Sequence, residues 1–379
     1  MKKKRLLIDV NSVVPFYATG RTTGIGRTTL ELVKALDDIR DELPFDVTLF
    51  SQNMKGIGGR NMQTGFRCKH LYLPHRPKFD RIAKTLALRE MLSPYDLMHV
   101  PHNYEIVRRP EKCIVTLHDA LFMKIHEQQF NHARMAEIVP PFIRQCKHII
   151  TCSAHSKKDI CETMGVAEEK VSVIYWGINH QRFCLLENKE SIEEGIKQRH
   201  GISRPFYMSV SCNGERKRTD VLIRSFMKFC KTSNSCDLVL VWRNPPEKLV
   251  NEVNATGMAD RIHFLRNIDD EELAELLNCA KALCFVSKYE GFGLPIIEAM
   301  ACGCPVITCR NSCLEEIGGV AAIYIEEPIN ESLVQLFIQL DEHQELLEAK
   351  IELGLTQANK FHWEKTAVQY AELYERLLK

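Results

Sequence analysis

The sequence lacks several features that would assign the chain to a protein class at once. No apolar stretch reaches the roughly 18 residues of a transmembrane helix, so none is expected. The apolar run Leu6–Ile8, after the basic N-terminus, is too short for the core of a signal peptide, and we expect a cytoplasmic protein. No Asp-x-Asp triplet occurs, and no internal repeat with a period of about 20–50 residues is visible.

Net charge is also nearly absent, because 50 Lys and Arg face 49 Asp and Glu, and nucleic acid is not an expected partner. The sum hides a division along the chain. Residues 1–200 carry 31 basic against 23 acidic side chains (+8), and residues 201–379 carry 19 against 26 (−7). Either two oppositely charged domains face each other, or the first half meets an anionic partner.

Cysteine, in contrast, is abundant, with 15 residues. Without a secretory signal these cysteines are expected to be thiols in apolar positions. Four of them cluster, but their spacing does not match the paired C-x-x-C ligands of a zinc site, so no metal is expected there: Cys302, Cys304, Cys309 and Cys313.

Short apolar strands alternate with helical patterns along the chain, which predicts two doubly wound parallel sheets. Strands are expected at 6–10, 47–50, 70–73, 97–100, 113–117, 148–152 and 171–175, then at 206–210, 237–242, 261–264, 282–286, 305–307 and 322–325. A polar helical connector is expected over 187–199. The last segment, 331–379, is predicted to be helical.

The most informative segment is the loop Glu290–Glu298, between a predicted strand and a predicted helix. Gly291 and Gly293 allow close backbone approach at a helix N-terminus, where amide groups attract anions. Glu290 and Glu298 flank this turn and suit sugar or ribose hydroxyls better than phosphate. The alternative is an ordinary helix start.

Two further segments predict anion contacts. Arg216-Lys217-Arg218 follows a strand, where the cations would neutralise a diphosphate, unless this is simply a solvated basic turn. Gly24 and Gly26 open the first long helix, but this loop is neither G-x-G-x-x-G nor a P-loop, and a plain tight turn is equally compatible.

Two histidines follow predicted strands. His118 ends the 113–117 strand, where it would bond a substrate hydroxyl or act as an acid or base, although a structural role is the alternative. His102 is a weaker candidate of the same kind.

Together these segments resemble retaining glycosyltransferase family 4, which has the GT-B fold. The similarity lies in V-S-K-Y-E-G-F-G-L-P-I-I-E-A-M-A-C-G-C-P-V-I (286–307), M-S-V-S-C-N-G-E-R-K-R-T-D-V-L-I-R-S-F (208–226), T-G-I-G-R (23–27), T-L-H-D (116–119), T-C-S-A-H-S-K (151–157) and F-H-W-E-K-T-A (361–367). Arg218 departs from the pattern, because Asn is common there.

The resemblance implies two Rossmann-like domains facing across a cleft, with domains at 1–195 and 196–360. A C-terminal helix, 361–379, would cross back onto the first domain. The donor would contact Arg216 and Lys217 with its diphosphate and Glu298 with its ribose. The remaining implied contacts are Glu290, Gly291, Phe292, Gly293 and Leu294 with the donor sugar, Gly24 and Gly26 with the diphosphate, and His118 with a sugar hydroxyl. Glu290, His118 and Lys217 would be the catalytic residues.

The implied reaction moves a hexose from a nucleotide-sugar to a saccharide hydroxyl, with retention and with neither metal nor cofactor. GDP-mannose is the first expected donor, since the T-G-I-G-R loop resembles mannosyltransferases of polysaccharide pathways such as O-antigen, lipopolysaccharide or capsule; a UDP-hexose is the alternative. A non-catalytic nucleotide-sugar binding module would be expected to lack Glu290 or Lys217. An NAD-dependent oxidoreductase would require the G-x-G-x-x-G loop, which fails at Thr29.

A basic amphipathic helix is predicted over 76–89, with basic residues at Arg76, Lys78, Arg81, Lys84 and Arg89. Such a helix would hold the protein on the inner face of the plasma membrane, next to a lipid-linked acceptor. The alternative is a helix packed on its own domain.

Overall fold

The computed structural model describes residues 3–20, 23–125, 131–326 and 330–379. The chain divides into two compact units: unit 1 is Met1–Gly177 with His362–Lys379, and unit 2 is Ile178–Phe361. The first division therefore falls after Gly177 and not after residue 195 as the sequence predicted. The connector is the helix α8 (Lys189–His200), and it belongs to unit 2 because its last turn pairs with acidic residues of that unit, including His200 Nε2 with Glu272 Oε1 at 2.7 Å.

Each unit is built on one parallel sheet. Unit 1 contains β1 (Lys4–Asp9), β2 (Phe45–Gln52), β3 (Arg67–Leu71), β4 (Leu97–Val100), β5 (Cys113–Thr116), β6 (His148–Thr151) and β7 (Val171–Val173). Unit 2 contains β8 (Phe206–Val210), β9 (Asp237–Val241), β10 (Ile262–Leu265), β11 (Ala282–Phe285), β12 (Val306–Cys309) and β13 (Ile323–Ile325).

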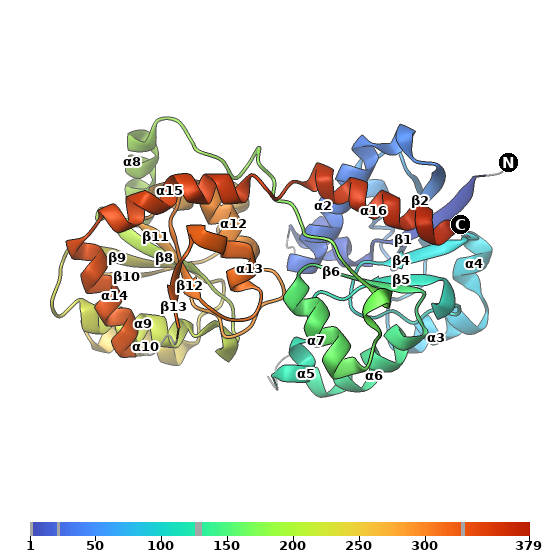
Figure 1. Ribbon diagram of the computed structural model, residues 1–379, viewed down its shortest axis with the longest axis horizontal. Helices are drawn as coiled ribbons and strands as arrows, with labels where there is room; N and C mark the ends of the chain where they lie inside the picture. The colour runs from blue at the N-terminus through green and yellow to red at the C-terminus, as the bar shows by residue number, and fades with distance from the viewer. Residues whose placement is uncertain (1–2, 21–22, 126–130, 327–329) are drawn as a thin grey trace. The chain divides into compact units, whose positions relative to one another are not determined.

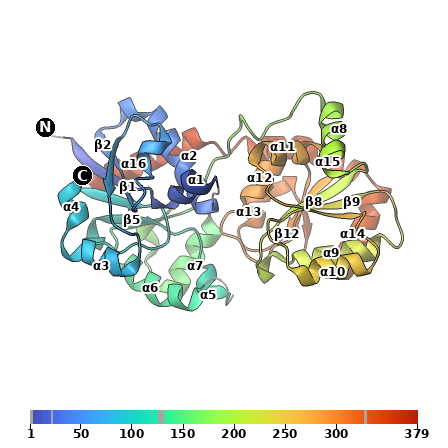
Figure 2. The same cartoon turned by 180° about the vertical axis from the view of Figure 1, so that it is seen from behind.

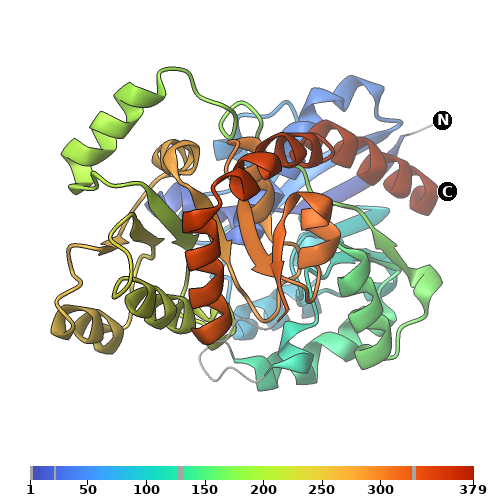
Figure 3. The same cartoon turned by 60° about the vertical axis from the view of Figure 1, so that its left-hand side comes forward.

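Helices cover both faces of each sheet (Figures 1 and 2). In unit 1 they are α1 (Val14–Thr19), α2 (Gly24–Asp38), α3 (Pro77–Thr85), α4 (Leu88–Leu92), α5 (Leu121–Lys124), α6 (His132–Gln145), α7 (Ala154–Met164) and α16 (Trp363–Leu378). In unit 2, besides α8, they are α9 (Thr219–Phe229), α10 (Glu247–Ala255), α11 (Asp270–Cys279), α12 (Leu294–Ala301), α13 (Leu314–Gly318), α14 (Asn330–Glu342) and α15 (Glu345–Ala358). Figure 3 shows α13 beside the last two strands of unit 2.

The strand orders are β3-β2-β1-β4-β5-β6-β7 and β10-β9-β8-β11-β12-β13, and every pair is parallel. Both sheets run outward in two directions from a central pair, β1 and β4 in unit 1 and β8 and β11 in unit 2. In such doubly wound sheets the loops after the central pair diverge and leave a crevice, which is where ligands bind. The predicted fold class is therefore confirmed, and the topology gives one expected ligand position in each unit.

The C-terminal helix α16 packs against α2 within unit 1 and carries two buried tyrosines. Tyr374 Oη lies 2.7 Å from His99 Nδ1, and His99 Nε2 lies 2.8 Å from Thr116 Oγ1. Where the chain leaves unit 1, a Cβ on Gly177 would lie 2.1 Å from the backbone nitrogen of Trp363, so only glycine fits. These contacts explain why the last helix belongs to the first unit.

Unit 2 has an aromatic core under β8. The rings of Tyr207, Phe226 and Phe229 surround Phe337 at centroid distances of 4.9, 5.6 and 5.6 Å. All four side chains are fully buried, each contributing about 1.5–3 kcal/mol of transfer free energy. This cluster fixes α9 and α14 on one face of the second sheet.

The basic segment 76–89 is not one helix. It consists of α3 and α4, which are separated by Ala87 in the left-handed region (φ 53°). Arg89 is buried, with its guanidinium 4.9 Å from the centre of the Phe50 ring, so it belongs to no surface. None of the helices in the described ranges is both long and apolar enough to cross a membrane.

The division of charge follows the structural units. Unit 1 holds 30 basic and 22 acidic side chains (+8), and unit 2 holds 20 and 27 (−7). The fifteen cysteines all lie within the described residues and are thiols, not disulfides. Cys302, Cys304, Cys309 and Cys313 are buried, as expected for thiols in apolar positions.

Candidate functional site

The loops that follow the central strands β8 and β11 bring three charged side chains of unit 2 together. The loop after β8 forms a short 3-10 helix, Glu215–Lys217, and the loop after β11 carries Glu290. The backbone N–H of Lys288 donates to the carbonyl of Arg216 at 2.6 Å and joins the two loops. Residues that are 74 positions apart in sequence therefore meet where the topology predicts a ligand.

Glu290 is paired with two cations. Its Oε1 lies 2.6 Å from Arg216 Nη1 and 2.7 Å from Lys217 Nζ. Arg216 Nη1 also donates to the carbonyl of Tyr289, and Lys217 Nζ lies 4.5 Å from the centre of the Phe285 ring. These contacts orient both cations before any ligand arrives.

The protonation of this triad follows from its burial. The side chains of Glu290, Arg216 and Lys217 are 11, 16 and 13% exposed. Burial alone would raise the pKa of Glu290, but the charges of Lys217 and Arg216 outweigh it and hold that pKa below its usual value. With Glu290 ionised, the triad carries a net charge of +1, which suits an anionic ligand.

The helix α12 begins directly after this loop. Gly293 is its N-cap in the left-handed region (φ 92°), a conformation that favours glycine, and no side chain caps the helix. Pro295 occupies the first turn, as predicted, and Glu298 lies one turn further on, buried. The sequence therefore placed the two glutamates correctly on either side of a helix N-terminus.

In unit 1 the predicted glycine loop is the first turn of α2. Thr23 is the N-cap, and its Oγ1 accepts the N–H of Gly26 at 3.1 Å. A Cβ on Gly24 would meet nothing within 4 Å, so packing does not explain this glycine. The two residues preceding Thr23 lie outside the described residues.

His118 follows β5 and is buried, as is its ring nitrogen Nδ1. Nε2 lies 3.2 Å from the carbonyl of Pro101, which can only accept, so Nε2 carries the proton and Nδ1 is the acceptor. The ring packs 5.1 Å from that of Trp176, beside a cavity of about 10 Å³ that is also lined by Trp363 and Tyr370. Burial lowers the pKa of His118 to about 4, so the imidazole is neutral at physiological pH.

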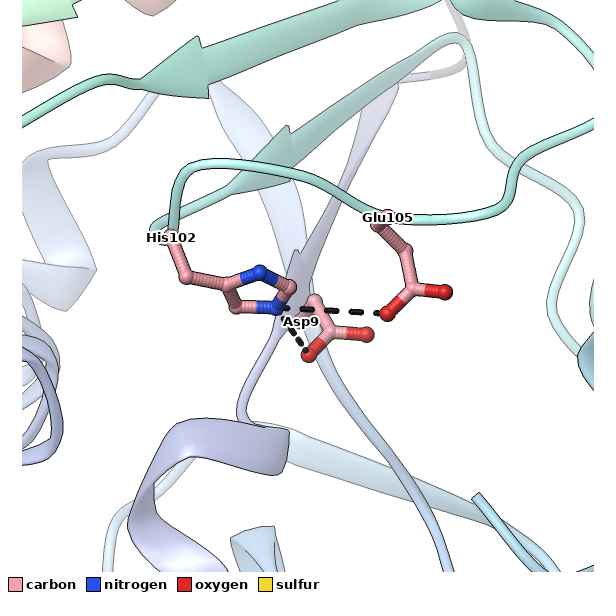
Figure 4. A group of neighbouring side chains, drawn as sticks. All are labelled: Asp9, His102 and Glu105. Carbon is pink, nitrogen blue, oxygen red and sulfur yellow. Dashed lines mark hydrogen bonds and ion pairs between the residues drawn. The ribbon is translucent and has the colours of Figure 1, made fainter. Parts of the chain in front are cut away.

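The structure also reveals a polar cluster that sequence reasoning missed. At the crevice between β1 and β4, His102 Nε2 lies 3.3 Å from Asp9 Oδ1 and 4.0 Å from Glu105 Oε2 (Figure 4). His102 was recognised only as a single residue after a strand. Asp9 ends β1 and is 93 positions from His102, and its signal was a charged residue closing an apolar strand.

The two Rossmann-like units, each built on a parallel doubly wound sheet, have the architecture of the GT-B fold. Residues 22–182 match the family model described as Glycosyltransferase Family 4, and residues 193–354 match the one described as Glycosyl transferases group 1. Together the two models span both units, so the chain belongs to the glycosyltransferases that combine these two domains, as the sequence motifs indicated.

Individual relatives agree with this assignment. The MMP alpha-(1->4)-mannosyltransferase of Mycolicibacterium hassiacum is 28% identical over 62% of this chain. The matched region spans 55% of that relative, so this chain covers about half of the relative's length. The O-antigen chain mannosyltransferase B of Escherichia coli is 25% identical over 94% of this chain and 96% of its own length. Sucrose-phosphate synthase from Thermosynechococcus elongatus shares the fold over 99% of both chains, with a TM-score of 0.78 and 17% identity.

Proposed function

We propose that this protein is a hexosyltransferase that uses a nucleoside diphosphate sugar and a saccharide acceptor in surface polysaccharide synthesis. The observation that supports it best is the Arg216–Lys217–Glu290 triad at the crevice of the second sheet. GDP-mannose is the first donor to test, because both curated relatives described above are mannosyltransferases. A UDP-hexose donor (glucosyl, galactosyl or N-acetylhexosaminyl) is the alternative.

In this proposal, different residues of unit 2 bind different parts of the donor. Arg216 and Lys217 bind the diphosphate, which would take over part of their pairing with Glu290. Glu298 accepts hydrogen bonds from the ribose hydroxyls. Glu290 binds the donor sugar, together with the backbone amides of residues 291–294.

In the proposed reaction, the acceptor oxygen forms a bond to the anomeric carbon while the bond from that carbon to the diphosphate oxygen breaks. The acceptor proton moves to the departing phosphate oxygen, on the same face of the sugar, and the configuration is retained. Negative charge that grows on the diphosphate is stabilised by Arg216 and Lys217, which are already in place. The two cations would stabilise the departing diphosphate as a metal ion can in other enzymes, so we propose metal-independent transfer.

His118 has a narrower role than the sequence allowed. A neutral imidazole with a pKa of about 4 is a poor general acid at physiological pH. We propose instead that its Nδ1 accepts a hydrogen bond from a sugar hydroxyl. His118→Asn, which keeps a short polar side chain, should therefore weaken transfer without shifting its pH dependence.

A donor screen tests the proposal directly. Thermal unfolding is measured with GDP-mannose, UDP-glucose, UDP-galactose and UDP-N-acetylglucosamine, since a bound donor raises the midpoint by mass action. Slow hydrolysis of the same donor then shows catalysis. Binding without any turnover would favour the non-catalytic alternative, and binding of no nucleotide-sugar would refute the assignment.

The second proposal concerns the exposed surface of α3 and α4. Arg76, Lys78, Arg81 and Lys84 are exposed there, beside three exposed apolar side chains: Ile82 (41%), Leu86 (57%) and Met91 (74%). Basic residues interleaved with exposed apolar ones suit an anionic lipid surface, where a lipid-linked acceptor would lie. The break at Ala87 shortens the helix but leaves these side chains exposed.

Co-sedimentation with vesicles tests this surface. Binding to phosphatidylglycerol vesicles should be lost in a variant with Lys78, Arg81 and Lys84 changed to Glu. The control is Lys158→Glu on α7, a 71% exposed cation of the same unit away from these apolar residues. Equal loss in the control, or no binding by the unchanged protein, would contradict the proposal.

A further inference from the structure

The buried cluster at the crevice between β1 and β4 of unit 1 has the composition of a metal site. Asp9 closes β1, and His102 and Glu105 lie on the loop after β4, with their side chains converging (Figure 4). One ligand atom from each of these three residues lies within 4.8 Å of the others. Asp9 and Glu105 are almost fully buried, at 0 and 4% exposure.

The distances fit a single ion. Ligand atoms about 2.0–2.2 Å from a tetrahedral zinc ion lie about 3.3–3.6 Å from one another. His102 Nε2 is 3.3 Å from Asp9 Oδ1 and 4.0 Å from Glu105 Oε2. The first distance matches this spacing and the second is longer, so the carboxylate of Glu105 would have to move toward the ion.

The outer contacts orient the imidazole as metal sites require. His102 Nδ1 lies 3.0 Å from the carbonyl of Tyr104, which can only accept. Nδ1 therefore carries the proton, and Nε2 faces the two carboxylates with its lone pair once it is neutral. A neighbouring histidine is held similarly: His75 Nδ1 lies 3.2 Å from Asp80 Oδ1, and its Nε2 lies 3.6 Å from Glu105 Oε2.

Charge balance gives a second argument. Asp9, Glu105 and Asp80 supply three negative charges, and Arg89, 3.5 Å from Glu105, supplies one positive charge. The carboxylates of this cluster therefore outnumber its guanidinium, which favours an additional cation beside them.

We propose that Asp9, His102 and Glu105 bind a divalent transition-metal ion such as zinc, with His75 beside it as the adjacent imidazole. The ion would tie the end of β1 to the loop after β4. This loop includes Pro101, whose carbonyl holds His118. The role is structural and separate from donor chemistry in unit 2, so the expectation of metal-independent transfer is unaffected.

Zinc binding to the full chain, stripped with a chelator, tests the site without any sugar nucleotide. We expect one equivalent of zinc by elemental analysis, and a rise in the unfolding midpoint of the full chain of about 3 °C at zinc concentrations about a hundredfold above Kd.

The decisive variant is His102→Gln, which keeps a donor toward Asp9 but removes the imidazole. It should lose at least about a hundredfold in zinc affinity. The matched control is His263→Gln in unit 2, where His263 Nε2 lies 3.1 Å from the buried Asp237 and no second carboxylate converges on this pair among the described residues. Circular dichroism establishes that both variants are folded.

Cobalt distinguishes this site from the fifteen thiols, because thiolate ligands add a strong charge-transfer band that oxygen and nitrogen ligands lack. A cobalt complex without this band supports the proposal. No zinc-dependent shift in the unchanged protein, equal affinity in His102→Gln, or a strong thiolate band would overturn it.

Discussion

The substitution Glu290→Gln separates the two tasks of the triad. It removes one negative charge from between Arg216 and Lys217 and keeps the size and a hydrogen-bonding group of the side chain. At 2.6 and 2.7 Å each ion pair is worth about 6 kcal/mol of gross Coulomb energy at an effective dielectric constant of 20. Because desolvation offsets much of this, we expect a loss of about 3–5 kcal/mol in the free energy of unfolding.

The freed cations should bind a nucleoside diphosphate more tightly. In the unchanged protein the triad offers a net charge of +1, and in Glu290→Gln it offers +2. One additional charge-assisted hydrogen bond contributes about 1.5–3 kcal/mol, so affinity for GDP or UDP should rise about tenfold or more. Sugar transfer should fall about 10²-fold or more, because we propose that the same carboxylate binds the donor sugar.

Isothermal titration with GDP and UDP measures the first effect, and transfer from the donor found in the screen measures the second. Glu298→Gln is the matched control, since it changes a buried carboxylate on the same helix start and leaves both ion pairs intact. In that variant nucleotide affinity should fall. If Glu290→Gln binds GDP and UDP no more tightly than the unchanged protein, the proposed competition between Glu290 and the diphosphate is wrong.

Three further predictions concern stability, each measured by urea or thermal unfolding of the full chain. Arg218→Asn should add about 1 kcal/mol, because Arg218 adopts a left-handed conformation (φ 51°) that Asn tolerates better; an unchanged midpoint would contradict this. Tyr374→Phe should cost about 1–3 kcal/mol, because it leaves the buried Nδ1 of His99 without its 2.7 Å partner. Burial lowers the pKa of His118 and of His148 to about 4 each. As the pH falls, both histidines are therefore protonated in the unfolded chain before they are protonated in the folded chain. The free energy of unfolding should keep this contribution above pH 6.5 and lose it between pH 6.5 and 4, by up to about 3 kcal/mol for each histidine. Replacing either histidine with Asn should make the free energy of unfolding depend less steeply on pH in this range.

Most of the fold could be predicted from the sequence because parallel strands buried on both faces form short apolar runs. Leu97–Val100 and Phe206–Val210 have the predicted bounds. The helix α1 was not predicted, because it has only six residues and none of them is buried. The break at Ala87 was not predictable either, since alanine normally favours helix and no glycine or proline marks a break there.

The candidate site was predictable where its residues are close in sequence. Glu290, Gly293 and Glu298 occupy one strand-to-helix turn, and their spacing carries the signal. The pairing of Glu290 with Arg216 and Lys217 depends instead on two loops that only the strand order brings together. The cluster of Asp9, His102 and Glu105 could not be predicted for the same reason, because Asp9 ends β1 and the other two residues follow β4.

The two crevices carry local charges that oppose the charge of their own units. The acidic unit 2 (−7) has a cation-rich triad, and the basic unit 1 (+8) has a cluster in which three carboxylates face one guanidinium. Surface charges act weakly beyond the screening length of about 8 Å at physiological ionic strength, whereas buried charges act on their neighbours with little screening. The sign of each ligand is therefore set by the few buried groups at the strand ends. These local charges support our proposals of an anionic donor in the acidic unit and a metal cation in the basic one.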